Sequence, residues 1–137
     1  MFYLNSGTFH SGAWVAGTQV GFLATVLIAV NNLRDRATDI KASKKTLAVR
    51  FGESFSKVEI AVLALAPFLG AFYWSSFGLK WAAWLPCFTL PIALRLVQNV
   101  RQTPPGAMYN QFLAQGAALH LSFGVLLSVG LALGVVP

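Results

Sequence analysis

The run GAWVAGTQVGFLATVLIAV, residues 12–30, decides the fold class, and NNLRDRATDIKASKKTLAVRFG, residues 31–52, follows it directly. The first run carries no charged residue. At 1.5 Å per residue it is about long enough to cross a hydrocarbon core of roughly 30 Å. The second run holds six of the ten basic and two of the four acidic residues of the chain. A membrane-spanning helix that leads into a charged segment is therefore predicted.

The rest of the chain has the same apolar character. Hydrophobic residues make up 56% of it, charged residues only 10%, and the mean hydropathy is +0.65. Because roughly a quarter of the residues of a soluble globular domain are charged, this composition indicates a membrane protein. We expect an all-α integral membrane bundle, a single membrane domain over residues 1–137. Its four transmembrane helices are predicted at about 12–30, 58–74, 81–97 and 112–136, with a charged loop at 31–57.

The distribution of the basic residues predicts the orientation. Seven of them lie in the loop 31–57, and Arg95 and Arg101 lie at and after the end of the third predicted helix. The positive-inside rule places these two connections in the cytoplasm, which for a bacterial protein means the cytoplasmic side of the inner membrane. The net charge of +6 would suit nucleic acid in a soluble protein, but here the bases flank apolar runs. We therefore expect the lipid bilayer as a partner and no nucleic acid.

Three oxygen-bearing side chains in the charged segment follow a helical spacing. Asn31, Asp35 and Asp39 are each four residues apart, so they share one face of a helix that continues through Asp39. Carboxylate and amide oxygens suit Mg²⁺, which takes one or two carboxylates and completes its shell with water and substrate phosphate. Nearby lysines and arginines would bind the remaining phosphate charge. The alternative is a solvated helix face whose ion pairs contribute little stability.

A second polar group lies near the start of the last predicted helix. Tyr109, Asn110 and Gln111 follow the turn TPPG on the predicted cytoplasmic side. They are candidates either for contact with an aromatic acceptor or for anchoring the helix at the membrane interface.

The charged segment resembles the second aspartate-rich motif of the UbiA-type membrane prenyltransferases. Its form N-N-x-R-D-x-x-x-D-x-x-x-x-K-x-T-L is similar to the branch that prenylates 1,4-dihydroxy-2-naphthoate in menaquinone synthesis. The run ALRLVQNVRQTPPGAMYNQFLAQGAALHLSFGVLLSVGL, residues 93–131, also resembles the end of that branch. The likeness thus covers almost the full chain.

This resemblance implies a reaction and a set of site residues. Mg²⁺ would neutralise the diphosphate of a polyprenyl diphosphate as a leaving group, and the naphthoate ring would attack the allylic cation with loss of carbon dioxide. Asp35 and Asp39 would be the catalytic residues and the metal ligands. The substrate-binding residues implied by the resemblance are Asn31, Asn32, Arg34, Lys44 and Lys45.

The chain departs from the family pattern in two ways. The family usually has nine transmembrane helices and two aspartate-rich motifs, whereas this chain resembles helices six to nine with one motif. Ser43 stands where a glycine usually precedes the lysines. We therefore expect a fragment or split half that is inactive alone and needs a chain supplying the first five helices. Alternatives are a prenyltransferase for another aromatic acceptor and a non-catalytic four-helix subunit or carrier.

Overall fold

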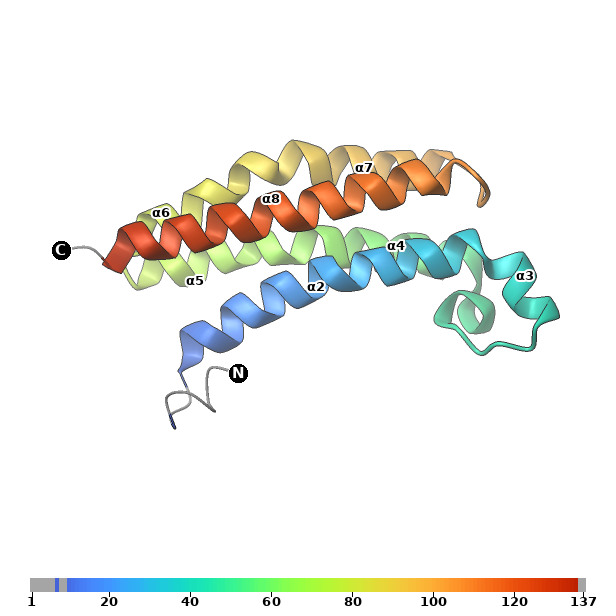
Figure 1. Cartoon of the computed structure of the whole chain (residues 1–137), viewed down its shortest axis with the longest axis horizontal. Helices are drawn as coiled ribbons and strands as arrows, with labels where there is room; N and C mark the ends of the chain where they lie inside the picture. Colours follow the sequence, from blue (N-terminus) through green and yellow to red (C-terminus); the bar gives the residue numbers. More distant parts are fainter. Residues whose placement is uncertain (1–6, 8–9, 136–137) are drawn as a thin grey trace.

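A computed structural model describes Gly7 and residues 10–135, and its described elements are all helices (Figure 1). The residues that start the first helix and end the last one lie at the same end of the bundle. In chain order the elements are α2 (Ser11–Arg34), α3 (Arg36–Lys41), α4 (Leu47–Leu65), the 3₁₀ turn η1 (Ala66–Leu69), α5 (Gly70–Ser76), α6 (Lys80–Trp84), the 3₁₀ turn η2 (Leu85–Thr89), α7 (Leu90–Gln102) and α8 (Tyr109–Val135).

These elements form four long rods that lie side by side. Helices α2 and α8 are each one rod, α4 continues through η1 into α5, and α6 continues through η2 into α7 (Figure 1). Three stretches of the described chain are long and apolar enough to span a membrane: Ser11–Arg34, Leu47–Ser76 and Tyr109–Gly134. These three candidate spans, identified by length and composition alone, overlap the spans predicted at 12–30, 58–74 and 112–136. The span predicted at 81–97 lies in the rod that η2 divides and stays a prediction.

Prolines mark the breaks in the second and third rods. Pro67 lies at the start of η1, and Pro86 at the start of η2. Proline lacks the amide N–H that a continuous helix needs, so the local pattern tightens to a 3₁₀ turn. At the first break the buried side chain of Gln19 bonds across from α2. Its Nε2 donates to the Pro67 carbonyl at 2.7 Å, and its Oε1 accepts from Trp74 Nε1 at 2.9 Å.

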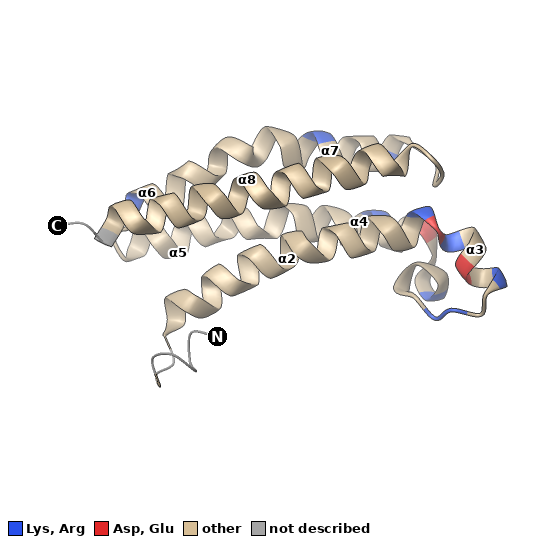
Figure 2. Cartoon of the chain, in the orientation of Figure 1, with Lys and Arg blue, Asp and Glu red and all other residues tan. Residues whose placement is uncertain are grey.

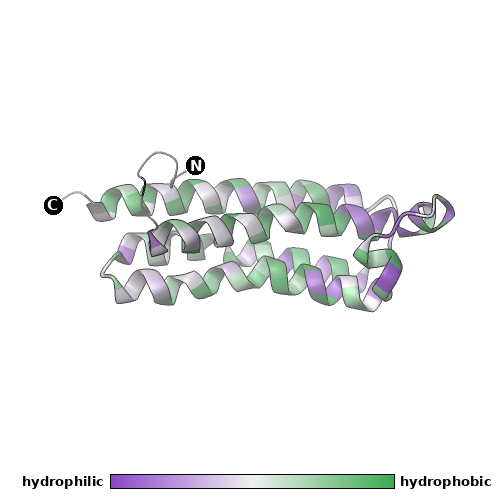
Figure 3. Cartoon of the chain, turned by 90° about the horizontal axis from the view of Figure 1, so that it is seen from below, coloured by the Kyte–Doolittle hydropathy of each residue, from purple (hydrophilic) through white to green (hydrophobic). Residues whose placement is uncertain are grey.

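The interior of the bundle is apolar and closely packed. Val26, Val30, Leu96 and Phe123 come from three different rods and are all fully buried. At Gly130 on α8 an added Cβ would lie 2.6 Å from backbone atoms of α6, so only glycine permits this approach. Hydrophobic residues occur along all of the rods (Figure 3), and many large ones are exposed on the outside, among them Phe72, Phe88 and Leu121. An apolar exterior over an apolar core is typical of a helix bundle in lipid.

Charge gathers at the end of the bundle that holds α3, opposite the start of α2 and the end of α8 (Figure 2). The predicted loop 31–57 is largely helical there, because α2 extends to Arg34, α3 follows, and α4 begins at Leu47 rather than at residue 58. Thr46 caps α4, its hydroxyl accepting from the Val49 N–H at 3.3 Å. Gly52 then interrupts the helix with φ of 87°, a left-handed conformation that favours glycine.

Candidate functional site

The backbone bends at Asp35, in the middle of the predicted three-residue set. The Asp35 N–H still donates to the Asn31 carbonyl at 3.0 Å, and the Asp39 N–H to the Asp35 carbonyl at 2.9 Å. The ψ angle of Asp35 is nevertheless 5°, which separates α2 from α3. The prediction of one unbroken helix through Asp39 is therefore wrong. These two hydrogen bonds persist at the bend, while α3 turns away from the axis of α2 (Figure 1).

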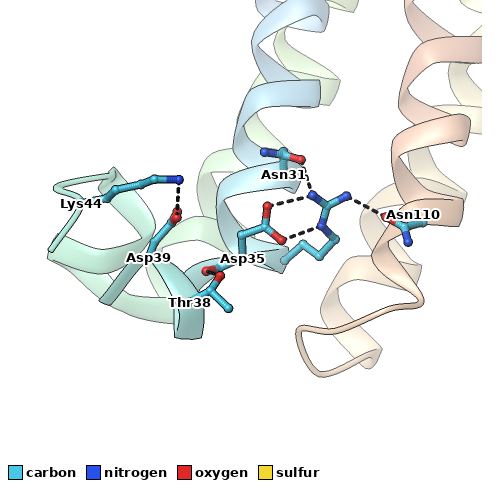
Figure 4. A network of polar contacts seen from close by, with 7 residues as sticks. Asn31, Asp35, Thr38, Asp39, Lys44 and Asn110 are labelled. Atoms are coloured by element: carbon cyan, nitrogen blue, oxygen red, sulfur yellow. Dashed lines mark hydrogen bonds and ion pairs between the residues drawn. The ribbon is translucent and has the colours of Figure 1, made fainter. Parts of the chain in front are cut away.

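Arg34 is the centre of a polar network at this bend. Its Nε and Nη2 donate to the two carboxylate oxygens of Asp35, both at 2.7 Å, in a bidentate pair. The same Nη2 donates to Asn31 Oδ1 at 2.7 Å, and Nη1 donates to Asn110 Oδ1 at 2.6 Å. Asn31, Asp35 and Asn110 thus surround one guanidinium group (Figure 4). The network joins the end of α2 to the start of α8, 76 residues away.

Asp39 has a different basic partner, which the turn after α3 puts in place. Lys44 Nζ lies 2.9 Å from Asp39 Oδ1, and the carboxylate side chain is only 6% exposed (Figure 4). The turn ends α3 with two backbone bonds, Lys44 N–H to the Asp39 carbonyl at 3.0 Å and Ser43 N–H to the Ile40 carbonyl at 3.1 Å. This is the pattern of a Schellman helix end, which requires a left-handed residue. Ser43 supplies it with φ of 57°.

The ion pairs set the charge states at this site. The Arg34 guanidinium, by hydrogen bonding and by its charge, holds the pKa of the Asp35 carboxyl below its usual value. The hydrogen bond and the charge of Asp39 raise the pKa of the Lys44 ammonium. These shifts stabilise the Asp35 carboxylate and the Lys44 ammonium in their ionised forms. Carboxylate oxygens are the ligands that a divalent cation such as Mg²⁺ takes in proteins.

The structure brings together some of the predicted site residues and leaves others apart. Asn31, Arg34 and Asp35 meet in one network, whereas Asp39 and Lys44 form a separate pair. Within the described part of the chain, the side chains of Asn32 and Lys45 make no hydrogen bond or ion pair with either group.

Two further polar contacts were not predicted from the sequence. Arg36 Nε donates to the Ala48 carbonyl at 2.9 Å and so holds α3 against the start of α4. Asn110, which is exposed, accepts from Arg34. Its neighbour Tyr109 is fully buried, with its hydroxyl near the Val100 and Thr103 carbonyls at 3.3 and 3.1 Å. Tyr109 therefore has a structural role at the end of α7.

Asn31, Asp35 and Asp39 carry the kinds of oxygen that Mg²⁺ takes as ligands. Among the described residues no group of three or more His, Cys, Asp or Glu side chains is arranged to hold a metal ion. Asp35 and Asp39 with the Asn31 amide instead supply two carboxylates and one neutral oxygen. Mg²⁺ is typically bound by one or two carboxylates together with water and substrate phosphates. The side-chain oxygens of Asn31 and Asp35 already bind one positively charged group, the guanidinium of Arg34.

Comparison with known proteins gives the family. A sequence model of the UbiA prenyltransferase family matches residues 1–123. The chain belongs to this family. Among curated relatives, this UbiA-family chain is 28% identical over 134 residues to a 1,4-dihydroxy-2-naphthoate octaprenyltransferase of Haemophilus influenzae. It is 31% identical over 109 residues to the protein of the same name of Escherichia coli, and 36% identical over 98 residues to a UbiA prenyltransferase domain-containing protein 1 homolog of Drosophila melanogaster.

The match covers most of this UbiA-family chain but only part of each relative. The aligned regions include 97%, 77% and 70% of the chain for the Haemophilus, Escherichia and Drosophila proteins. They include 44%, 35% and 26% of those proteins, so the chain spans less than half the length of the curated relatives that it matches. No solved structure matches the chain.

Proposed function

We propose that this chain forms one side of a membrane site that transfers a polyprenyl group from an allylic diphosphate to 1,4-dihydroxy-2-naphthoate. The carbon–oxygen bond of the allylic diphosphate breaks and the diphosphate leaves with the electron pair. The ring carbon that carries the carboxylate bonds to the prenyl carbon, and the carboxylate is lost as carbon dioxide. Family membership and the names of the Haemophilus and Escherichia relatives support this reaction.

The observation that carries the proposal is the position of two aspartate side chains, each paired with a basic residue, at the charged end of an apolar bundle. Acidic residues beside the hydrocarbon region are costly and are seldom retained without a use. Bound Mg²⁺ would neutralise the negative charge of the leaving diphosphate. Asp35, Asp39 and Asn31 would hold the metal. Asn32, Arg34, Lys44 and Lys45 would line the diphosphate side of the site.

Lys44 has two tasks in this scheme. In the structure it neutralises Asp39, and its pKa is raised there, so it stays protonated over the physiological range. Its side chain is 65% exposed, and its ammonium group has three donors. It is therefore able to keep Asp39 in place while it turns a second N–H toward a phosphate oxygen.

The apolar surface of the bundle offers a place for the prenyl chain. A groove of about 660 Å³ runs between α2 and α8 and is lined mainly by small and aliphatic residues, among them Val20, Gly124 and Leu127. A polyprenyl chain held by its diphosphate at the charged end would follow such an apolar face into the membrane.

We further propose that the reaction requires a second set of helices with its own diphosphate ligands. The chain aligns with 44% of the Haemophilus relative, and its two aspartates offer a clamp from one side only. In this arrangement the rod of α6, η2 and α7 is a fourth transmembrane segment, and the charged end faces the cytoplasm of a bacterial inner membrane.

Co-expression tests this function. The chain is produced in a membrane free of host prenyltransferase, alone or with a second chain that supplies five further helices, and it is given an allylic diphosphate and 1,4-dihydroxy-2-naphthoate. We expect the prenylated product only when the partner is present. Product formed by the chain alone would contradict the need for a second half. Absence of product in both cases, with both chains inserted, would favour a non-catalytic membrane subunit. If a different aromatic acid is prenylated and 1,4-dihydroxy-2-naphthoate is not, the proposed acceptor is wrong.

A further inference from the structure

The guanidinium of Arg34 lies where a metal ion would have to approach. Its Nε and Nη2 cover both carboxylate oxygens of Asp35 and the amide oxygen of Asn31, all at 2.7 Å. A positive group this close to the ligands repels a divalent cation and competes for the same lone pairs. Arg34 must therefore release Asp35 before a metal binds there.

Asn110 keeps a separate hold on the same guanidinium. It accepts from Nη1 at 2.6 Å, whereas Asp35 uses Nε and Nη2 (Figure 4). The bond to Asn110 therefore does not depend on the bond to Asp35 and is able to persist after Asp35 is released. Since Asn110 belongs to α8, the released guanidinium stays at the edge of the site, tied to a different rod of the bundle.

We propose that Arg34 is an exchangeable internal cation: it neutralises Asp35 and hydrogen-bonds the Asn31 amide oxygen when no metal is bound, and it passes to the diphosphate when metal enters, with Asn110 as the pivot. The inference rests on the proposed function. The fork of Nε and Nη2 that fits a carboxylate also fits two oxygens of a phosphate, so the exchange replaces one bidentate anion with another. Asn110 is in this scheme a positioning residue.

The exchange couples the two ligands of the site. Without diphosphate, the metal must displace a guanidinium that has no other anion to bind, so the metal binds weakly. Metal with diphosphate gives the guanidinium a new partner, so each ligand strengthens the binding of the other by the same factor. In the absence of diphosphate the site stays closed by its own arginine.

Mn²⁺ in place of Mg²⁺ makes this coupling measurable without turnover. The chain, assembled in its membrane with the second set of helices that completes the site, is titrated with Mn²⁺. Bound Mn²⁺ is followed by electron paramagnetic resonance with and without inorganic pyrophosphate. For Arg34→Gln we expect Mn²⁺ alone to bind roughly tenfold more tightly, as loss of a competing charge-assisted bond predicts. In Arg34→Gln the addition of pyrophosphate should increase the affinity for Mn²⁺ hardly at all.

Asn110→Leu tests the pivot, and Asn99→Leu is its matched control. Asn99 also makes a hydrogen bond between helices, from Nδ2 to Gln115 Oε1 at 3.1 Å, but it does not bind Arg34. We expect Asn110→Leu to weaken pyrophosphate binding in the presence of Mn²⁺ by roughly tenfold. Asn99→Leu should leave that binding unchanged. Equal losses in the two variants would mean that Asn110 acts only through helix packing and would overturn its role as pivot.

The outcomes separate this inference from the proposed function. If the wild type binds Mn²⁺ and pyrophosphate but Arg34→Gln binds Mn²⁺ no more tightly, the exchange is contradicted while the metal–diphosphate site stands. If the wild type binds neither ligand, the site itself is contradicted, and the exchange is contradicted with it.

Discussion

Gln19→Leu tests how the bundle tolerates the proline break in its second rod. The substitution keeps the size of the side chain but removes its amide group, which both donates and accepts a buried hydrogen bond. The Pro67 carbonyl and the Trp74 N–H therefore lose their bonds to α2. Interhelical hydrogen bonds in membranes contribute about 0.6 kcal/mol on average and up to about 1.7 kcal/mol, which for two bonds gives roughly 1–3 kcal/mol. We expect a loss of stability in this range.

The stability of this variant is measured by unfolding the protein in mixed micelles with increasing denaturing detergent, followed by circular dichroism. Thr18→Leu is the matched control, because Thr18 is the exposed neighbour on α2. We expect the control to change the free energy of unfolding by less than about 0.5 kcal/mol. If Gln19→Leu unfolded at the same detergent concentration as the control, the network would not stabilise the break, and our account of η1 would be refuted.

Three further predictions concern the turn, the helix contact and the orientation. Ser43→Gly should stabilise the end of α3 by roughly 0.5–1 kcal/mol, the left-handed penalty of serine less the larger entropy of unfolded glycine. This substitution should therefore slow hydrogen exchange at the Lys44 amide. Faster exchange would contradict the view that Ser43 is strained in its left-handed conformation. Gly130→Ala should destabilise the bundle by about 1–3 kcal/mol through the contact with α6. The control Gly124→Ala should not lower the melting temperature, because nothing lies within 4 Å of an added Cβ at that position. Equal losses of stability in the two variants would contradict the close approach of Gly130 to the backbone of α6. A cysteine introduced at Ser43 in a Cys87→Ser background should react with an impermeant thiol reagent only after the membrane is opened, whereas labelling of intact cells would reverse the orientation.

The apolar rods were predictable from the sequence, and their interruptions were not. The run 12–30 has no proline and continues into helical residues, so the sequence predicts α2, but it extends the helix through Asp39 whereas α2 ends at Arg34. Pro67 and Pro86 are visible in the sequence. Whether a helix breaks at a proline, however, depends on a distant partner for the freed backbone groups, here Gln19. The start of α4 at Leu47 was missed because its first turns carry charge, although Thr46 is a typical capping residue.

The candidate site was predictable in its members but not in its pairing. Asn31 and Asp35, which are four residues apart, both bind the Arg34 guanidinium, and their binding of a metal ion stays a prediction. The bend at Asp35 separates Asp39 from them, and spacing alone contains no signal for that bend. The contact of Arg34 with Asn110 depends on how α2 and α8 pack, so no local pattern in the sequence predicts it.

The most direct test of the metal–diphosphate clamp compares three carboxylate-to-amide substitutions in the assembled, active protein. Asp35→Asn and Asp39→Asn keep the side-chain size and remove the charge that a metal needs. Each should lower turnover by roughly a hundredfold to a thousandfold, as loss of one preorganised electrostatic contact commonly does. Extra Mg²⁺ should partly restore the rate. Glu53→Gln also breaks an ion pair, with Lys57 at 2.8 Å, but it lies outside the clamp and should change turnover little. Equally small effects of all three substitutions in normally inserted protein would contradict the clamp and leave the charged segment as a solvated, orienting surface.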